Sequence, residues 1–93
     1  MNENIDVFVK RICSKFGYTK EDFIAPRGNR EMSRIRNMVF YILHKDLQFS
    51  LSNISKYFNR QIRTIVIANA TIKYRLLNNF SEEIELYNKC KKR

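Results

Sequence analysis

Only two glycines and one proline occur in this chain of 93 residues, and this scarcity limits what it can fold into. Tight turns and Gly-rich phosphate loops depend on these residues, so a fold of many short strands is disfavoured. Apolar residues instead recur with the period of an amphipathic helix, first between Ile5 and Phe16. The sequence therefore predicts an all-α fold, a bundle of four to five helices that forms a single domain over residues 1–93.

Polar residues mark where these helices are expected to begin and end. Asn4 and Thr19 are suitable N-caps, and Gly17 can end the first helix in a left-handed turn. The expected elements are, in order, a helix over 5–16, a capped turn at 19–22, a basic loop over 25–30, a helix over about 31–47, two helices within 50–77 and a last helix after residue 80.

The segment from Ser50 to Leu77 meets the demands of a helix-turn-helix. Its turn needs a residue that tolerates positive φ, and Asn59 is the best choice after Gly. The first helix needs an apolar residue, a small residue where the second helix crosses it, and a buried residue at its end, and it has Ile54, Ser55 and Phe58. The second helix needs two residues three positions apart that face the core, and it has Ile65 and Ala68. Short helical hairpins in bundles that bind no DNA meet similar demands, so a plain helical bundle is the alternative.

The second helix of this pair is expected to present a polar face. A helical wheel places Ile62, Ile65, Asn69 and Ile72 inward and Arg60, Arg63, Thr64, Ile67 and Thr71 outward. Arg63 can bond guanine, and Gln61 at the helix start can bond adenine. The methyl groups of Thr64 or Ile67 can pack on thymine, although Ile67 could instead contact the last helix or be a stray surface residue.

Basic residues are concentrated in the middle of the chain. The formal net charge is +9, and residues 25–79 hold ten bases and two acids, with no acid between Asp46 and Glu82. Such an asymmetry favours a nucleic-acid partner over a solvated face alone. A basic helix on a membrane surface is the rival, but no segment pairs a basic face with a large exposed apolar face.

Other classes of function have little support in the sequence. No apolar run is long enough to span a membrane, and the polar N-terminus is unlike a signal peptide, so a cytoplasmic, nucleoid-associated protein is expected. One His, His44, and two cysteines, Cys13 and Cys90, provide neither a zinc cluster nor a catalytic pattern. We therefore expect no enzyme, no cofactor and no metal. The Phe and Tyr residues fit core packing, with stacking on single-stranded bases as the alternative.

These pieces, in this order, resemble the C-terminal DNA-binding domain of the bacterial replication initiator DnaA, a Trp repressor-like helix-turn-helix. The resemblance covers nearly the whole chain. It rests on segments 12–18, 21–23 and 47–58, and on Arg60, Thr64, Ile65, Ala68 and Ile72 in the recognition helix, with one Gly missing before Arg60. The family's Asp and His, which read bases, are replaced by Gln61 and Ile62, and its first Thr by Arg63. Without a Gly-rich loop, the sequence is expected to supply at most the DNA-binding module of such an initiator.

The resemblance also implies contacts outside the base-reading face. Arg27 and Arg30 of the basic loop would reach the minor groove or flanking phosphates. Backbone N–H groups near Leu51 and Ser52 would face a phosphate. Further phosphate contacts are expected from Arg34, Lys56, Arg60 and Lys73. The family binds a single asymmetric site, so a monomer on double-stranded DNA is expected.

Sequence-specific binding of duplex DNA is therefore the leading hypothesis, in replication initiation or in the control of a phage or mobile element. The missing Asp and His motivate an alternative on the same fold. It is a protein-interaction module, or a transcriptional regulator, with altered DNA readout.

Overall fold

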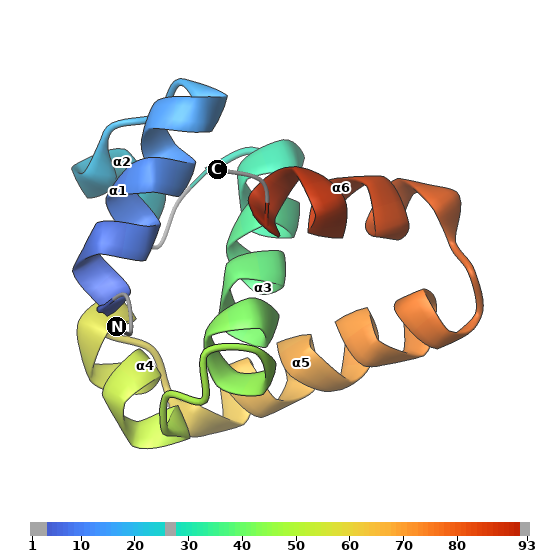
Figure 1. Cartoon of the computed structure of the whole chain (residues 1–93). Coiled ribbons are helices and arrows are strands. Elements are labelled where there is room, and N and C mark those ends of the chain that lie inside the picture. Colours follow the sequence, from blue (N-terminus) through green and yellow to red (C-terminus); the bar gives the residue numbers. More distant parts are fainter. Residues whose placement is uncertain (1–3, 26–27, 92–93) are drawn as a thin grey trace.

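The computed structural model describes residues 4–25 and 28–91, which form six helices and no strand (Figure 1). The helices are α1 (Ile5–Phe16), α2 (Lys20–Ile24), α3 (Arg30–Lys45), α4 (Leu51–Phe58), α5 (Ile62–Leu77) and α6 (Ser81–Lys91). The all-α prediction is confirmed. The six helices are one more than the largest number expected. The additional helix is the capped turn after Thr19, which continues to Ile24.

Side-chain caps begin four of these helices. Each cap accepts a hydrogen bond from the N–H group three residues later, which satisfies a donor that a helix start leaves unpaired. The four caps are Asn4, Thr19, Asn29 and Ser50, with donor–acceptor distances of 2.8, 3.1, 2.7 and 3.0 Å. Gly17 ends α1 at φ 80°, as the sequence indicated.

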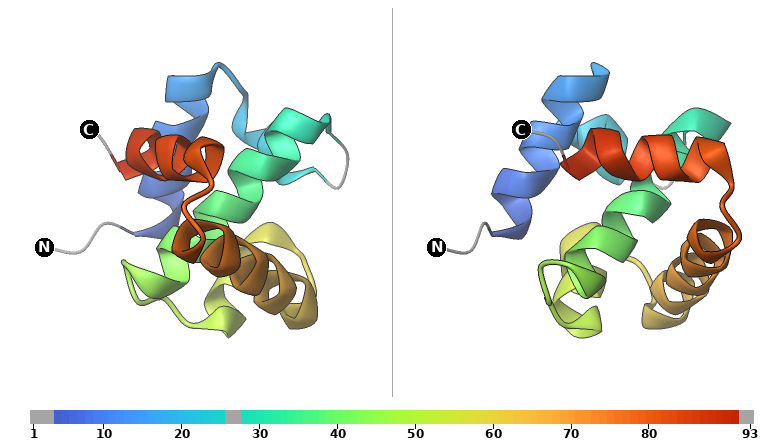
Figure 2. Two further views of the ribbon diagram at one scale, coloured as in Figure 1. Left: turned by 90° about the vertical axis from the view of Figure 1, so that its right-hand side faces the viewer. Right: turned by 45° about the vertical axis from the view of Figure 1, so that its right-hand side comes forward.

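Helix α3 runs through the middle of the molecule and packs against α4, α5 and α6. Helices α1 and α2 pack against each other on one side of it, and α5 and α6 lie on the other (Figures 1 and 2). Helix α4 and the start of α5 therefore form one end of the molecule, and α5 packs against α6 as well.

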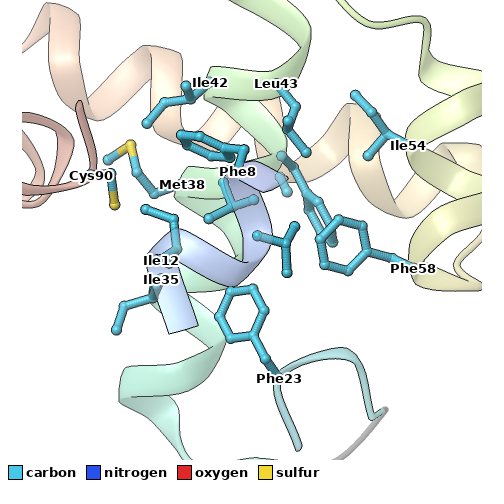
Figure 3. Close-up of a cluster of buried hydrophobic side chains, with 14 of the residues drawn as sticks. Phe8, Ile12, Phe23, Ile35, Met38, Ile42, Leu43, Ile54, Phe58 and Cys90 are labelled. Atoms are coloured by element: carbon cyan, nitrogen blue, oxygen red, sulfur yellow. The ribbon is translucent and has the colours of Figure 1, made fainter. Parts of the chain in front are cut away.

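The hydrophobic core joins α1, α2, α3 and α4. Phe58, at the end of α4, is fully buried, and its ring centroid lies 4.9 Å from that of Phe40 and 6.3 Å from that of Phe23. Both contacts are edge-to-face, which is a favourable geometry for aromatic rings. Figure 3 shows Phe58 and Phe23 beside aliphatic side chains of α1 and α3. The orientation of α4, and with it the helix-turn-helix, is thus fixed by aromatic packing.

Polar contacts at Asp6 hold α1, α2 and α4 together. The Asp6 carboxylate accepts hydrogen bonds from Lys20 Nζ at 2.6 Å and from the Tyr57 hydroxyl at 2.7 Å. Lys10 Nζ lies 3.1 Å from its other oxygen. The Lys20 bond first, then the Tyr57 and Lys10 bonds, hold the pKa of Asp6 well below its usual range. Burial and the bond to Asp6 raise the pKa of Tyr57 to about 12.

We expect Asp6→Asn to destabilise the protein at neutral pH, because both lysines lose their counter-charge. The pKa of Asp6 is lower in the folded than in the unfolded state, so its contribution is complete above the unfolded pKa. It is lost as the pH falls below about 4. Urea unfolding at pH 7 and pH 3 measures this: the gap between wild type and variant should narrow at pH 3. Glu85→Gln, at an exposed acid of α6, is the control, and equal effects of the two substitutions would contradict the expectation.

Helix α6 is attached by its acid Glu83, which is only 3% exposed. Glu83 Oε1 lies 3.3 Å from Arg34 Nη2 on α3 and 3.2 Å from Arg75 Nη1 on α5. At the opposite end of α6, Lys15 Nζ on α1 donates to the carbonyl oxygen of Lys89 at 2.6 Å. Helix α6 is therefore held at both ends by cations of other helices.

Candidate nucleic-acid interface

Helices α4 and α5 form a helix-turn-helix with a short connection, residues 59–61. Asn59 has φ 53° and ψ 50°, which confirms the prediction of a left-handed residue in the turn. Ile54 and Phe58 of α4 and Ile65 and Ala68 of α5 are buried, as the sequence also predicted. The two helices thus meet through the positions that a helix-turn-helix requires.

The turn is locked by a reciprocal pair of hydrogen bonds between Ser55 and Arg60. The Arg60 N–H group donates to the carbonyl oxygen of Ser55 at 3.1 Å. In return, the Ser55 hydroxyl donates to the carbonyl oxygen of Arg60. The sequence indicated a small residue at position 55 for reasons of space, and the structure adds this polar role.

The start of α5 is open to solvent. Gln61 is its N-cap but makes no capping bond with its side chain, so the amide is available to a ligand. Arg63 and Thr64 are exposed, and Arg63 has no ion pair among the residues that the structure describes. Because the first N–H groups of a helix have no intrahelical acceptor, this end attracts negative charge. Three of the four proposed base-reading residues therefore surround one accessible helix terminus.

One side chain of this helix was placed wrongly by the helical wheel. Ile62 was expected to face inward, but it is 45% exposed. The inward stripe of α5 consists of Ile65, Ala68 and Ile72, so the row through Ile62 lies on the flank of the helix. Ile67 is 59% exposed and makes no contact that buries it, which leaves it on the outer face, as expected.

The cations around this helix-turn-helix have few acids to pair with, since α4 and α5 contain none. Arg30, Lys56 and Lys73 are exposed and have no ion pair within residues 4–25 and 28–91. Ser52 is exposed and Leu51 half-buried at the start of α4, so the N–H groups of this terminus are accessible. The acids lie elsewhere and are largely engaged, as with Asp6 and Glu83 above.

Two of the side chains expected to contact phosphates already have partners within the protein. Arg34 is held by internal ion pairs with Glu83 and, at 3.6 Å, with Glu82, so its charge is already balanced. Arg60 donates from Nη1 to the Phe58 carbonyl oxygen at 2.7 Å and from Nη2 to the Ala25 carbonyl oxygen at 3.0 Å. Its guanidinium therefore joins the end of α4 to the segment before the basic loop.

Of the two arginines of the basic loop, the structure describes Arg30. Arg27 falls outside the described residues. Arg30, at the start of α3, lines a hollow of about 760 Å³ together with Thr71 and Arg75 of α5. Arg30 thus lies near the second half of α5, in a hollow that Glu82 and Glu83 of α6 also line.

Sequence reasoning missed His44 and Lys45 as parts of this surface. They line a hollow of about 180 Å³ with Leu51 of α4 and Val66 and Lys73 of α5. His44 Nδ1 lies 3.0 Å from the Phe49 carbonyl oxygen, which only accepts, so Nδ1 donates and Nε2 remains for another partner. Lys45 and Lys73 become neighbours only because α3 crosses α5, and no sequence pattern marks such a crossing.

Comparison with known proteins assigns this arrangement to a family. Residues 5–72, from the start of α1 to the buried Ile72 of α5, match the family model described as the bacterial dnaA protein helix-turn-helix. The chain belongs to the DnaA helix-turn-helix family. The resemblance inferred from the sequence is thereby confirmed, and the family match includes the whole turn and the exposed start of α5.

One relative shows which share of a DnaA protein this chain matches. It is 36% identical over 70 residues to the chromosomal replication initiator protein DnaA of Oleidesulfovibrio alaskensis. The match spans 75% of this chain but only 15% of that relative. DnaA-family membership supports DNA binding by the helix-turn-helix. None of the helices in the described part of the chain has both the length and the hydropathy needed to cross a membrane.

Proposed function

We propose that this chain binds double-stranded DNA in a sequence-dependent manner through α4 and α5. One observation carries the proposal: in a helix-turn-helix of the DnaA family, the open end of α5 presents Arg63 and Thr64 within a surface of unpaired cations. A polyanion supplies the missing negative charge, and a duplex supplies a groove wide enough for a helix.

In this proposal, α5 enters the major groove with its N-terminal turns. Arg63 bonds guanine through two parallel hydrogen bonds, and Gln61 bonds adenine through its free amide. Thr64 and Ile67 contact base edges through their methyl groups. The exposure of all four side chains supports these roles.

The remaining contacts position the protein on the sugar–phosphate backbone. N–H groups at Leu51 and Ser52 face one strand at the start of α4, and Lys45 and Lys73 neutralise phosphates beside it. Arg30 reaches the minor groove or a phosphate on the far side of α5, and Lys56 adds a further phosphate contact. Arg34 and Arg60 are left out because both are held internally.

We further propose that one copy of the chain occupies one asymmetric site, in replication initiation or in the control of a phage or mobile element. A role in replication initiation is supported by the relative from Oleidesulfovibrio alaskensis, which is named a chromosomal replication initiator protein. Both roles require the same DNA-binding surface, so the test below precedes any choice between them.

Selection of bound fragments from a pool of random duplexes tests the proposal. We expect one enriched, non-palindromic site. On that site, Arg63→Ala should weaken binding by about 1–3 kcal/mol and relax the preference at one base pair, because a bidentate contact to a base is lost. Fluorescence anisotropy with the selected site and single-base variants of it measures both effects.

Lys89→Ala is the control, because Lys89 is an exposed cation on α6, away from the helix-turn-helix. It should leave both affinity and preference unchanged. A pool that yields no enriched sequence, together with no salt-dependent duplex affinity, would contradict the proposal. A protein partner that shields Arg63 and Ile67, and that DNA fails to displace, would support the interaction module instead.

A further inference from the structure

The first two turns of α5 expose three branched aliphatic side chains among the proposed base-reading residues. Ile62 is 45%, Val66 46% and Ile67 59% exposed. Ile67 belongs to the proposed base contacts, but Ile62 and Val66 have no role in them. They lie four residues apart and therefore form a row along one flank of the helix.

This row continues the proposed DNA surface. Ile62 is followed directly by Arg63 and Thr64, and Val66 borders the hollow that Leu51 and Lys73 also line. Each of the two keeps nearly half of its surface exposed to solvent. Single exposed aliphatic residues are common on protein surfaces and need no explanation. Two in a row, on the one helix that faces the ligand, fit an apolar group of that ligand.

A duplex offers few apolar groups to a helix in the major groove. The C5-methyl group of thymine is the one that distinguishes a base pair there. The side chain of Ile62 can neither donate nor accept a hydrogen bond. A contact with bases through Ile62 therefore has to be apolar.

We propose that Ile62 and Val66 contact thymine methyl groups and so make thymines a requirement of the bound site. This inference rests on the duplex binding proposed above and names which bases the flank of α5 reads.

Replacing thymine by deoxyuridine removes the methyl group and leaves the hydrogen-bonding edges intact. The experiment takes the duplex enriched from the random pool and substitutes each thymine in turn. We expect one or two positions at which deoxyuridine weakens binding about three- to fivefold, the effect of one buried methyl group. The other thymines should show no change.

The variants Ile62→Ala and Val66→Ala then assign the contacts. Each should bind thymine and deoxyuridine equally at one of the sensitive positions and keep the discrimination at the other. Both side chains are exposed, so the fold should be retained, and circular dichroism checks this. Val7→Ala is the matched control: Val7 is 50% exposed on α1, and its variant should keep the full discrimination.

The outcomes separate this inference from the proposed function. A selected duplex that is bound equally well with thymine or deoxyuridine at every position, or that contains no thymine, overturns the inference and leaves duplex binding intact. Discrimination that persists in both alanine variants also overturns it. If no duplex is bound at all, the proposed function fails first, and the inference fails with it.

Discussion

Phe58→Ala is expected to lower the free energy of unfolding by about 3–5 kcal/mol, the usual cost of removing a buried aromatic side chain. Phe58 is completely inaccessible to solvent, and its ring lies within 6.3 Å of those of Phe23, Phe40 and Tyr57. Its removal leaves a cavity where α2, α3 and α4 meet. A domain of this size has a total stability of about 5–15 kcal/mol, so a large fraction is lost.

Thermal and urea unfolding followed by circular dichroism measure this effect. The melting temperature should fall by at least about 12 °C. Tyr74→Ala is the matched control, since Tyr74 is an aromatic residue on α5 that is 62% exposed. It contacts only the edge of the Phe80 ring, so its loss should cost about 1 kcal/mol or less. Similar losses for the two variants would mean that Phe58 is not the anchor of the helix-turn-helix.

Duplex affinity is expected to fall about a hundredfold when the salt concentration rises from about 50 to about 200 mM. Four cations of the proposed surface neutralise phosphates, namely Arg30, Lys45, Lys56 and Lys73, and each neutralised phosphate releases a condensed counterion. The cations responsible have no ion pair among the described residues, so DNA does not compete with an internal acid for them. Anisotropy titrations at four or five salt concentrations give the slope.

Single substitutions show how much each side chain contributes to this salt dependence of the affinity. Lys56→Ala should reduce the slope of log affinity against log salt by about 0.9, because one phosphate contact is lost. Lys89→Ala should leave the slope unchanged, since that exposed cation lies on α6. The expectation fails if the two variants behave alike, or if the affinity of the unmodified protein is insensitive to salt.

Local signals were sufficient to predict most of the fold. The caps Asn4, Thr19 and Ser50 and the left-handed residues Gly17 and Asn59 lie where the sequence placed them, because capping and positive φ depend on a few neighbouring residues. The helix-turn-helix followed from the same signals together with the spacing of its apolar residues. The match to the DnaA helix-turn-helix family then confirmed the resemblance seen in the sequence.

The parts that sequence reasoning missed all depend on how the helices cross. Ile62 was placed inward because an apolar residue at helical spacing usually belongs to the core stripe, but the buried stripe of α5 runs through Ile65, Ala68 and Ile72 and leaves Ile62 exposed. Arg34 and Arg60 were taken for free cations, because their partners, Glu83 and the Ala25 carbonyl oxygen, lie 49 and 35 residues away. His44 and Lys45 join Lys73 only through the crossing of α3 and α5.

The two bonds of the Arg60 guanidinium have a consequence for recognition. They connect the Phe58 carbonyl oxygen in the turn to the Ala25 carbonyl oxygen before the basic loop. The span between α5 and the chain that enters this loop is therefore set before any DNA arrives. Fixing these two segments relative to each other is therefore not part of the entropy cost of the proposed DNA binding.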